Sequence, residues 1–124
     1  MDVVGGELYD VELEPEVGEW LSSLTPKQYR QALEAVDFLV DAPTTLGEPH
    51  ARYLGSGLRE LRLRVHPRNM RLTYWLAPGR RIVLLTVFPK TRSLERREVE
   101  RARAVMKECQ AEHPPATHFW EPDA

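Results

Sequence analysis

The alternation of apolar and polar side chains divides the chain into short strands and longer helices. Residues 8–13 (LYDVEL) alternate as a half-buried strand does. Apolar residues at helical spacing then predict a short helix from Pro15 and a longer one that follows Thr25, an N-cap residue with proline directly after it. Pro43 ends this second helix. Residues 43–57 are rich in Pro, Gly and Thr, which predicts a loop.

The second half of the chain predicts strands joined by short turns. Residues 58–65 alternate, with apolar side chains on one face and charged side chains on the other. The runs 71–76 and 81–88 follow, and the IVLLTVF core of the latter is too apolar for an edge strand. A charged helix with an apolar stripe opens at Ser93 and ends before Pro114.

This order of elements predicts an α+β fold: a small antiparallel sheet in the order β-α-α-β-β-β-α, packed on one face by helices. The other face of the sheet is then open, and the charged side of the strand 58–65 lies on it. The length of 124 residues fits a single domain. We assign residues 1–112 to this domain and residues 113–124, which lack periodicity and contain three prolines, to a C-terminal tail.

Charge is divided unevenly along the chain, although the formal net charge is only −2. Residues 1–50 carry 2 basic and 11 acidic side chains, whereas residues 51–107 carry 15 basic and 4 acidic ones. One strongly positive surface is therefore expected, which attracts a polyanion. Most of the cations are arginine, whose planar fork matches phosphate and stacks on bases, so RNA is favoured as partner. An arginine-rich proteome explains arginine over lysine, but not the segregation of charge.

Several classes of protein are excluded by what the sequence lacks. No apolar run is long enough for a membrane span, and the acidic start is unlike a signal peptide, so a cytoplasmic protein without a membrane partner is expected. The single cysteine, Cys109, lies in a helical pattern and is interpreted as a core residue. The scatter of His50, His113 and His118 supports no metal site, and no cofactor is expected.

A composite motif spans the stretches LGSGLRELRLR, RLTYW and IVLLTVFPKTRSLERREVERAR. Its residues are Gly57, Leu58, Glu60, Leu61 and Arg62 in the first stretch, Arg71 and Tyr74 in the second, and Leu84, Leu85, Phe88, Lys90, Glu98 and Ala102 in the third. This composite resembles the RelE/ParE superfamily of toxins, in particular the HigB-like (phage-derived Gp49-like) branch of type II toxin–antitoxin systems. Each piece alone would be a weak signal.

The resemblance implies a RelE-like fold and a ribosome-dependent messenger RNA endoribonuclease. In such an enzyme the 2′-hydroxyl of the RNA attacks the adjacent phosphate, which leaves a 2′,3′-cyclic phosphate and a 5′-hydroxyl and needs no metal. The implied partners are messenger RNA, the ribosome and a cognate antitoxin, usually a helix-turn-helix DNA-binding protein.

By motif position, Arg62, Arg71 and Lys90 are the candidates to stabilise the charge of the phosphorane. Glu60 shares a strand face with Arg62, which favours its ionised form and makes it a candidate base. His66 is the histidine beside the basic strands and is a candidate acid or base. Two interpretations stay open: the arginines can simply pair with Glu60 across strands, and His66 can be a turn residue only.

Further cations and one aromatic residue are candidates for RNA binding: Arg59, Arg64, Arg92 and Trp75. Trp75 lies on the Arg71 face of its strand, where it could stack on a base, whereas Tyr74 points with the leucines into the core. Arg92 takes the place of the second of two adjacent lysines found in many nucleases of the family.

Two rival functions share the same resemblance. A ParE-like toxin has the fold but inhibits DNA gyrase by binding, without nuclease activity. An inactive remnant would bind RNA or an antitoxin without catalysis. The retained Arg62, Arg71 and Lys90 favour the nuclease over the gyrase inhibitor, while the lack of a C-terminal Arg-Tyr element leaves the proton-transfer groups unassigned.

Overall fold

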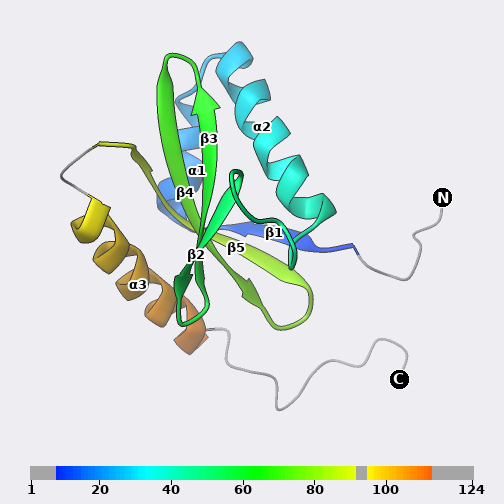
Figure 1. Cartoon of the computed structure of the whole chain (residues 1–124), viewed down its shortest axis with the longest axis vertical. Helices are drawn as coiled ribbons and strands as arrows, with labels where there is room; N and C mark the ends of the chain where they lie inside the picture. Colours follow the sequence, from blue (N-terminus) through cyan, green and yellow to red (C-terminus); the bar gives the residue numbers. More distant parts are fainter. Residues whose placement is uncertain (1–7, 92–94, 113–124) are drawn as a thin grey trace.

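Five strands and three helices make up the part of the chain that the computed structural model describes, residues 8–91 and 95–112 (Figure 1). In chain order they are β1 (Asp10–Leu13), α1 (Pro15–Ser22), α2 (Pro26–Asp41), β2 (Ala51–Gly55), β3 (Leu58–Val65), β4 (Arg68–Ala77), β5 (Arg81–Pro89) and α3 (Glu95–Glu112). The α+β class is confirmed. The predicted helix start at Ser93 and the tail 113–124 lie outside the described residues.

The sheet is mixed, which corrects the prediction of a purely antiparallel one. Its strand order is β1-β5-β4-β3-β2, with β5 interior as predicted. β1 pairs with β5 in parallel, whereas the pairs β2–β3, β3–β4 and β4–β5 are antiparallel. Parallel strands need a long crossover connection, and here α1, α2 and the first hairpins lie between them. Alternation in the sequence marks a strand but does not give its direction.

The predicted loop 43–57 contains a strand, which is a second correction. β2 pairs with the first half of β3, with Ala51 opposite Leu61 and Tyr53 opposite Arg59. A tight turn through Gly55 and Gly57, which have φ of 98° and 88°, joins the two strands and requires the left-handed backbone that glycine adopts without strain. Proline, glycine and threonine on both sides of these five residues had indicated a loop, although the segment itself pairs as a strand.

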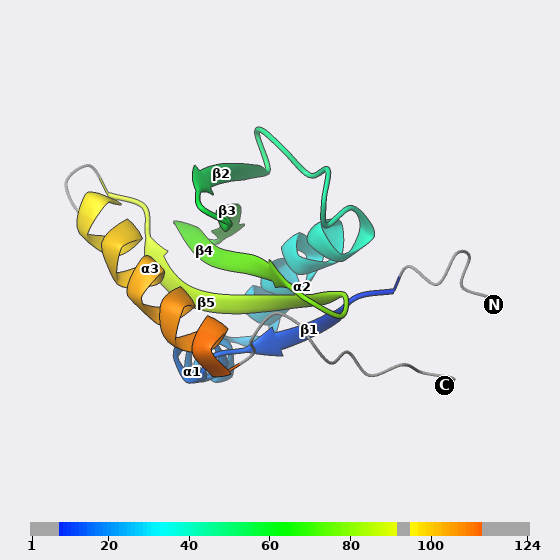
Figure 2. The same ribbon diagram turned by 90° about the horizontal axis from the view of Figure 1, so that it is seen from below.

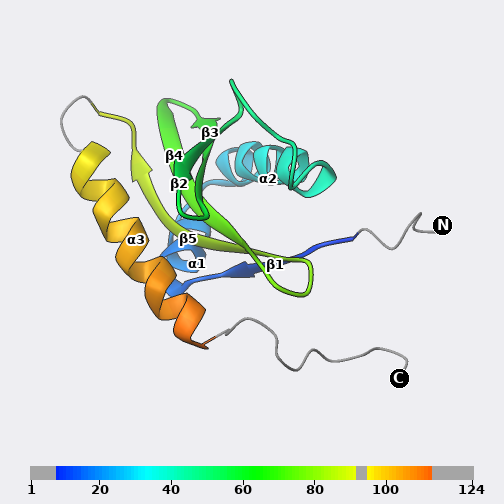
Figure 3. The same ribbon diagram turned by 60° about the horizontal axis from the view of Figure 1, so that its bottom comes forward.

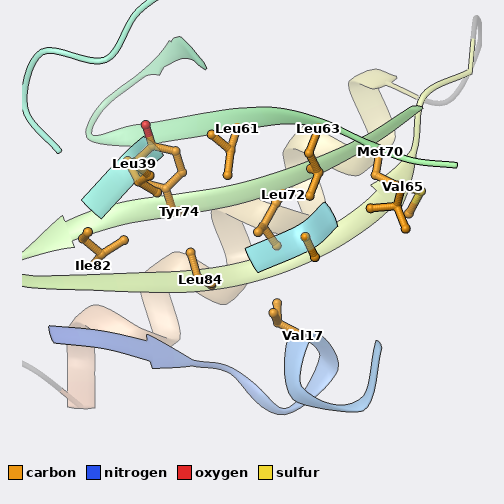
Figure 4. Packing of buried hydrophobic residues seen from close by; sticks show 11 residues of the cluster. Val17, Leu39, Leu61, Leu63, Val65, Met70, Leu72, Tyr74, Ile82 and Leu84 are labelled. Carbon is orange, nitrogen blue, oxygen red and sulfur yellow. The ribbon is translucent and has the colours of Figure 1, made fainter. Parts of the chain in front are cut away.

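The sheet is covered on both sides, whereas the sequence predicted helices on one face only. In Figures 1, 2 and 3 α2 lies on one side of β3 and β4 and α3 on the other. The α1–α2 face holds the larger core, with buried residues Val17, Ala32, Leu39, Leu61, Leu63, Val65, Met70, Leu72, Tyr74, Ile82 and Leu84 (Figure 4). The prediction that Tyr74 is a core residue is confirmed.

The second core lies between α3 and the opposite sheet face, which we call the α3 face. Its buried residues are Leu58, Trp75, Ala77, Val83 and Leu85 of the sheet and Ala102, Met106 and Cys109 of α3. The apolar stripe of α3 must be buried somewhere, and α1 and α2 already occupy the other face. The core position predicted for Cys109 is confirmed, and α3 covers one end of the face that was expected to be open.

The start of α2 shows why the helical prediction succeeded. Thr25 Oγ1 accepts a hydrogen bond from Gln28 N at 3.2 Å, and Thr25 N donates to Gln28 Oε1 at 3.0 Å. This capping box satisfies two of the N–H groups that a helix leaves unpaired at its first turn. None of the helices within residues 8–91 and 95–112 combines the length and the apolar character of a membrane-spanning helix.

Candidate functional site

Strand alternation and register bring the predicted charged residues together on the α3 face. Glu60, Arg62 and Arg64 point to this face from β3, because the leucines between them enter the α1–α2 core. In the β3–β4 ladder Arg62 lies opposite Arg71, and Glu60 lies opposite Thr73. We call Glu60, Arg62, Arg64, Arg71 and Thr73 the polar end of the α3 face, and the residues of the second core its apolar end.

Glu60 is the centre of the polar end. It is 1% exposed, and its Oε2 lies 3.6 Å from Arg71 Nε and 3.8 Å from Arg62 Nε. All three atoms are buried, and within the described residues none has a hydrogen-bond partner. A buried polar atom without a hydrogen bond is costly, so these three atoms lower the stability of the protein unless a ligand pairs with them.

The two arginines have different second partners. Arg62 donates through Nη1 to Glu48 Oε1 at 2.9 Å, in the loop before β2, and its side chain is 27% exposed. Arg71 donates through Nη1 to Met70 O at 3.1 Å and is 12% exposed. Arg71 is therefore held inside the cluster, whereas Arg62 lies at its rim.

Burial raises the pKa of the Glu60 carboxyl above its ordinary value, and this effect is larger than any other. Arg71 is the strongest opposing influence, Glu95 adds to the increase, and Arg62 and Arg52 act against it. Arg62 lowers the pKa of Glu60 as expected, but burial raises it more. The prediction that Arg62 favours the ionised form of Glu60 is corrected accordingly. A carboxyl with a raised pKa is better suited to exchange protons at neutral pH.

Several neighbours of this carboxyl were missed by the sequence analysis. Arg52 of β2 and Glu95 of α3 act on it, although Arg52 lies in the predicted loop and Glu95 is not one of the motif residues of its helix. Thr73 is buried opposite Glu60 in the β3–β4 ladder, and its hydroxyl oxygen lies 2.6 Å from that of the buried Thr86 on β5. Because Thr73 lies two residues after Arg71 on the same predicted strand, alternation could have assigned it to this face.

Lys90 and Arg64 lie near Asn69, at the hairpin end of β3 and β4. The backbone N of Lys90 donates to Asn69 O at 2.8 Å, and Arg64 Nη1 donates to Asn69 Oδ1 at 3.1 Å. Lys90 Nζ lies 3.9 Å from Glu95 Oε1, and Glu95 is one of the groups that act on Glu60. Lys90 is therefore connected to the cluster through this one carboxylate.

His66 lies in the turn between β3 and β4, away from the cluster. Its N donates to Gln31 Oε1 at 2.9 Å, and its carbonyl accepts from Gln28 Nε2 at 3.1 Å, so its backbone is tied to α2. Along an extended strand, six residues separate it from Glu60 by about 20 Å. The structure does not bring these two predicted proton-transfer residues together.

The remaining predicted RNA-binding residues lie elsewhere. Trp75 is on the predicted face but only 8% exposed, because α3 covers it, and its Nε1 donates to Cys109 Sγ at 3.3 Å. The prediction that Trp75 stacks on an RNA base is therefore wrong. Arg59 alternates to the other face, where it lies 5.1 Å from the ring centre of Tyr53. Arg92 lies outside the described residues.

No group of three or more His, Cys, Asp and Glu side chains in residues 8–91 and 95–112 is arranged to hold a metal ion. The polar end offers instead one buried carboxyl flanked by fixed guanidinium groups. Such an arrangement can bind an anionic group and exchange a proton with it.

Comparison with known proteins assigns the chain to a family. The family described as "Phage derived protein Gp49-like (DUF891)" matches residues 19–107, which include Glu60, Arg62, Arg71 and Lys90. The chain belongs to this family. No curated protein matches the sequence.

Two solved structures resemble this Gp49-like chain. An archaeal RelE–RelB complex from Pyrococcus horikoshii OT3 contains a chain with 26% identity and a TM-score of 0.53, over 69% of this chain and 99% of that one. A mutant of the E. coli toxin RelE in the free state has 16% identity and a TM-score of 0.57, over 82% of this chain and 97% of that one. The fold is that of RelE toxins, and the predicted resemblance to the RelE superfamily is confirmed.

Proposed function

We propose that this chain is the toxin of a type II toxin–antitoxin pair and cleaves messenger RNA on the ribosome. The observation that carries the proposal is the buried Glu60 Oε2 between the Nε atoms of Arg62 and Arg71, because none of these three atoms has a hydrogen-bond partner among the described residues. A phosphodiester with an adjacent 2′-hydroxyl supplies what these groups lack. It offers anionic oxygens to the arginines and a proton to the carboxylate.

In the proposed reaction Glu60 is the general base. Its carboxylate accepts the proton of the 2′-hydroxyl while the 2′-oxygen attacks the adjacent phosphorus. The pKa of Glu60, raised by burial, increases its strength as a proton acceptor. His66 takes no part in this step, because it lies about 20 Å away along the strand.

Arg62 and Arg71 stabilise the charge that develops on the phosphorane, with Lys90 beside them. Fixed donors in a site that excludes water stabilise such charge without having to reorganise. The bond between phosphorus and the 5′-oxygen then breaks, the 5′-oxygen takes a proton from solvent, and Glu60 releases its proton to solvent. The products are a 2′,3′-cyclic phosphate and a 5′-hydroxyl, and no step requires a metal.

The partners follow from the same proposal. Messenger RNA and the ribosome are polyanions, and the excess of cations in residues 51–107 suits them. A cognate antitoxin, of the helix-turn-helix class that accompanies HigB-like toxins, keeps the chain inactive in the cytoplasm. The archaeal relative, a RelE–RelB complex, supports a protein partner of this kind.

The proposal is tested by inducing the chain in cells and mapping the 5′ ends of messenger RNA. We expect new 5′-hydroxyl ends within translated regions, which disappear with Arg71→Ala but remain with Lys107→Ala, an exposed cation on α3. Co-expression of the neighbouring gene should relieve the toxicity. Inhibition of gyrase supercoiling without new RNA ends would contradict the proposal and favour a ParE-like inhibitor.

A further inference from the structure

A cavity of about 280 Å³ opens between β2, β3 and α3, next to the polar end of the α3 face. Its lining includes Arg52, Glu60, Glu95, Arg96, Val99 and Glu100. The volume lies just below the lower limit of small-molecule pockets, about 300 Å³, so it suits a single aromatic side chain. Glu60 connects the cavity to the catalytic cluster, because its Oε2 lies 3.6 Å from Arg71 Nε.

The segment that follows α3, residues 113–124 (HPPATHFWEPDA), has no role in the proposed reaction. It contains two adjacent aromatic residues, Phe119 and Trp120, and two acidic residues, Glu121 and Asp123, but no lysine or arginine. Burial of large aromatic side chains is strongly favourable. A segment of this composition therefore matches an apolar recess with cations at its rim.

The cavity beside the polar end offers such surroundings. Arg52 on β2 and Arg96 on α3 are both exposed, and Val99 adds apolar surface to the lining. A guanidinium group pairs with a carboxylate and also stacks on an aromatic ring. Glu100, also in the lining, can accept a hydrogen bond from the indole N–H of Trp120. The cavity thus complements the aromatic pair and the acids that follow it.

The segment has the length to reach the cavity from the end of its own helix. Val99 lies about 20 Å along the axis of α3 from Glu112, where the helix ends. Residues 113–118 contain two adjacent prolines, and six residues of extended polyproline-type chain span about 19 Å. A tail that turns back along α3 therefore brings Phe119 and Trp120 level with Val99. The acidic residues that follow then reach the first turn of α3, beside the polar end.

We propose that residues 119–123 of this chain dock in the cavity when no RNA is bound, and that RNA must displace them to reach the polar end. The inference rests on the proposed function and adds autoinhibition to it. One ring of the aromatic pair enters the cavity, and the other stacks on a guanidinium group at the rim. The carboxylates of Glu121 and Asp123 stay at the rim, because the acids of the lining repel them inside.

The covalent connection makes a weak contact sufficient. A short linker holds a segment near its site at an effective concentration of about 1 mM, so that an intrinsic Kd of about 0.1 mM gives about 90% occupancy. RNA then binds only to the open tenth of the molecules, which weakens its apparent affinity by about tenfold. Inhibition is therefore moderate, and a strand that contacts several cations at once displaces the tail.

The docked state is tested by limited proteolysis of the full chain with chymotrypsin, which cleaves after aromatic residues. Mass spectrometry follows cleavage at residues 119–120, whose rate reports the undocked fraction of the tail. Val99→Trp, which fills the cavity, should increase this rate by about tenfold. Lys27→Trp is the matched control, because it introduces the same side chain at an exposed position of α2, and it should leave the rate unchanged.

The effect on RNA is measured on the full chain with a fluorescent pentanucleotide that lacks every 2′-hydroxyl, followed by anisotropy. Phe119→Ala combined with Trp120→Ala should increase the affinity for this oligomer by about tenfold. Tyr29→Ala removes an exposed aromatic side chain from α2 instead and should leave the affinity unchanged. Thermal melting of each variant establishes that it is folded.

Ribosome-dependent cleavage, measured on the same samples, tells the failures apart. Cleavage of messenger RNA by the wild type, combined with equal proteolysis of wild type and Val99→Trp, would overturn the inference and leave the proposed function intact. Protection of the tail without cleavage of messenger RNA by any variant would uphold the docked tail and contradict the nuclease. Protection that increases with protein concentration would place the tail on a second copy and overturn docking within one chain. Unchanged oligomer affinity of the double alanine variant would overturn the inhibition.

Discussion

The apolar and polar ends of the α3 face come from neighbouring positions of the same strands, yet they are buried in different ways. At the apolar end Trp75 packs under α3, and its indole N–H donates to Cys109 Sγ at 3.3 Å. Burial raises the pKa of this thiol, which keeps it in its neutral form. At the polar end Glu60 is only 1% exposed, but its Oε2 and two neighbouring arginine Nε atoms have no hydrogen-bond partner within residues 8–91 and 95–112.

This difference separates stability from function within one sheet face. Removing apolar side chains from water stabilises the fold by about 25 cal/mol per Å². Burying charged groups without hydrogen bonds costs stability. Departures from good packing and pairing concentrate at functional sites, so the polar end is where a ligand is expected, whereas the apolar end holds α3 in place.

The largest effect is expected for Glu60→Gln, which keeps the shape of the side chain but removes the proton acceptor. Cleavage of a defined messenger RNA on purified ribosomes should fall by about 10²- to 10⁴-fold, the usual contribution of a general base. A rate equal to that of the wild type would make Glu60 only an ion-pair partner of Arg62 and Arg71.

Trp75→Ala tests the apolar end. Loss of a buried indole and the cavity that it leaves should lower the free energy of unfolding by about 3–5 kcal/mol, as measured by urea denaturation. Cleavage per folded molecule should change far less than for Glu60→Gln. Trp75→Phe is the matched control and should lose less stability. A large loss of activity with unchanged stability would refute the division between the two ends.

Arg71→Ala removes the more buried cation of the polar end. If Arg71 stabilises the phosphorane, cleavage should fall by about 10²- to 10³-fold, while affinity for ribosomes changes little, because the interaction is strongest in the transition state. Lys107→Ala should leave both quantities unchanged. Full activity of Arg71→Ala would contradict the catalytic interpretation of the cluster.

The smallest effect is a pH dependence of stability. Because the pKa of Glu60 is raised above 4.5 in the folded protein, the folded state binds more protons than the unfolded state between 4.5 and the raised value. Stability should therefore decrease as the pH rises through this interval. Melting temperatures measured across it should show a flatter profile for Glu60→Gln, and identical profiles would be the contrary result.

Much of the fold could be predicted because local signals were strong. The strand over residues 58–65 was predicted with its observed bounds. Thr25 was predicted as the N-cap of the second helix, and α2 begins directly after it. Alternation also gave the face shared by Glu60, Arg62 and Arg64, because successive side chains of a strand point to opposite sides. These properties depend on residues close together in the sequence.

The tertiary structure decided what lies opposite each face. The sequence shows that Trp75 and Arg71 share a side of β4. In the folded protein α3 covers Trp75, whereas Arg71 lies beside Glu60. Likewise, the strand face that Glu60 shares with Arg62 indicated an ionised carboxylate, whereas burial in the folded protein raises the pKa of Glu60. Periodicity determines which side chains share a face, while burial and pKa depend on elements that are distant along the chain and meet only when it folds.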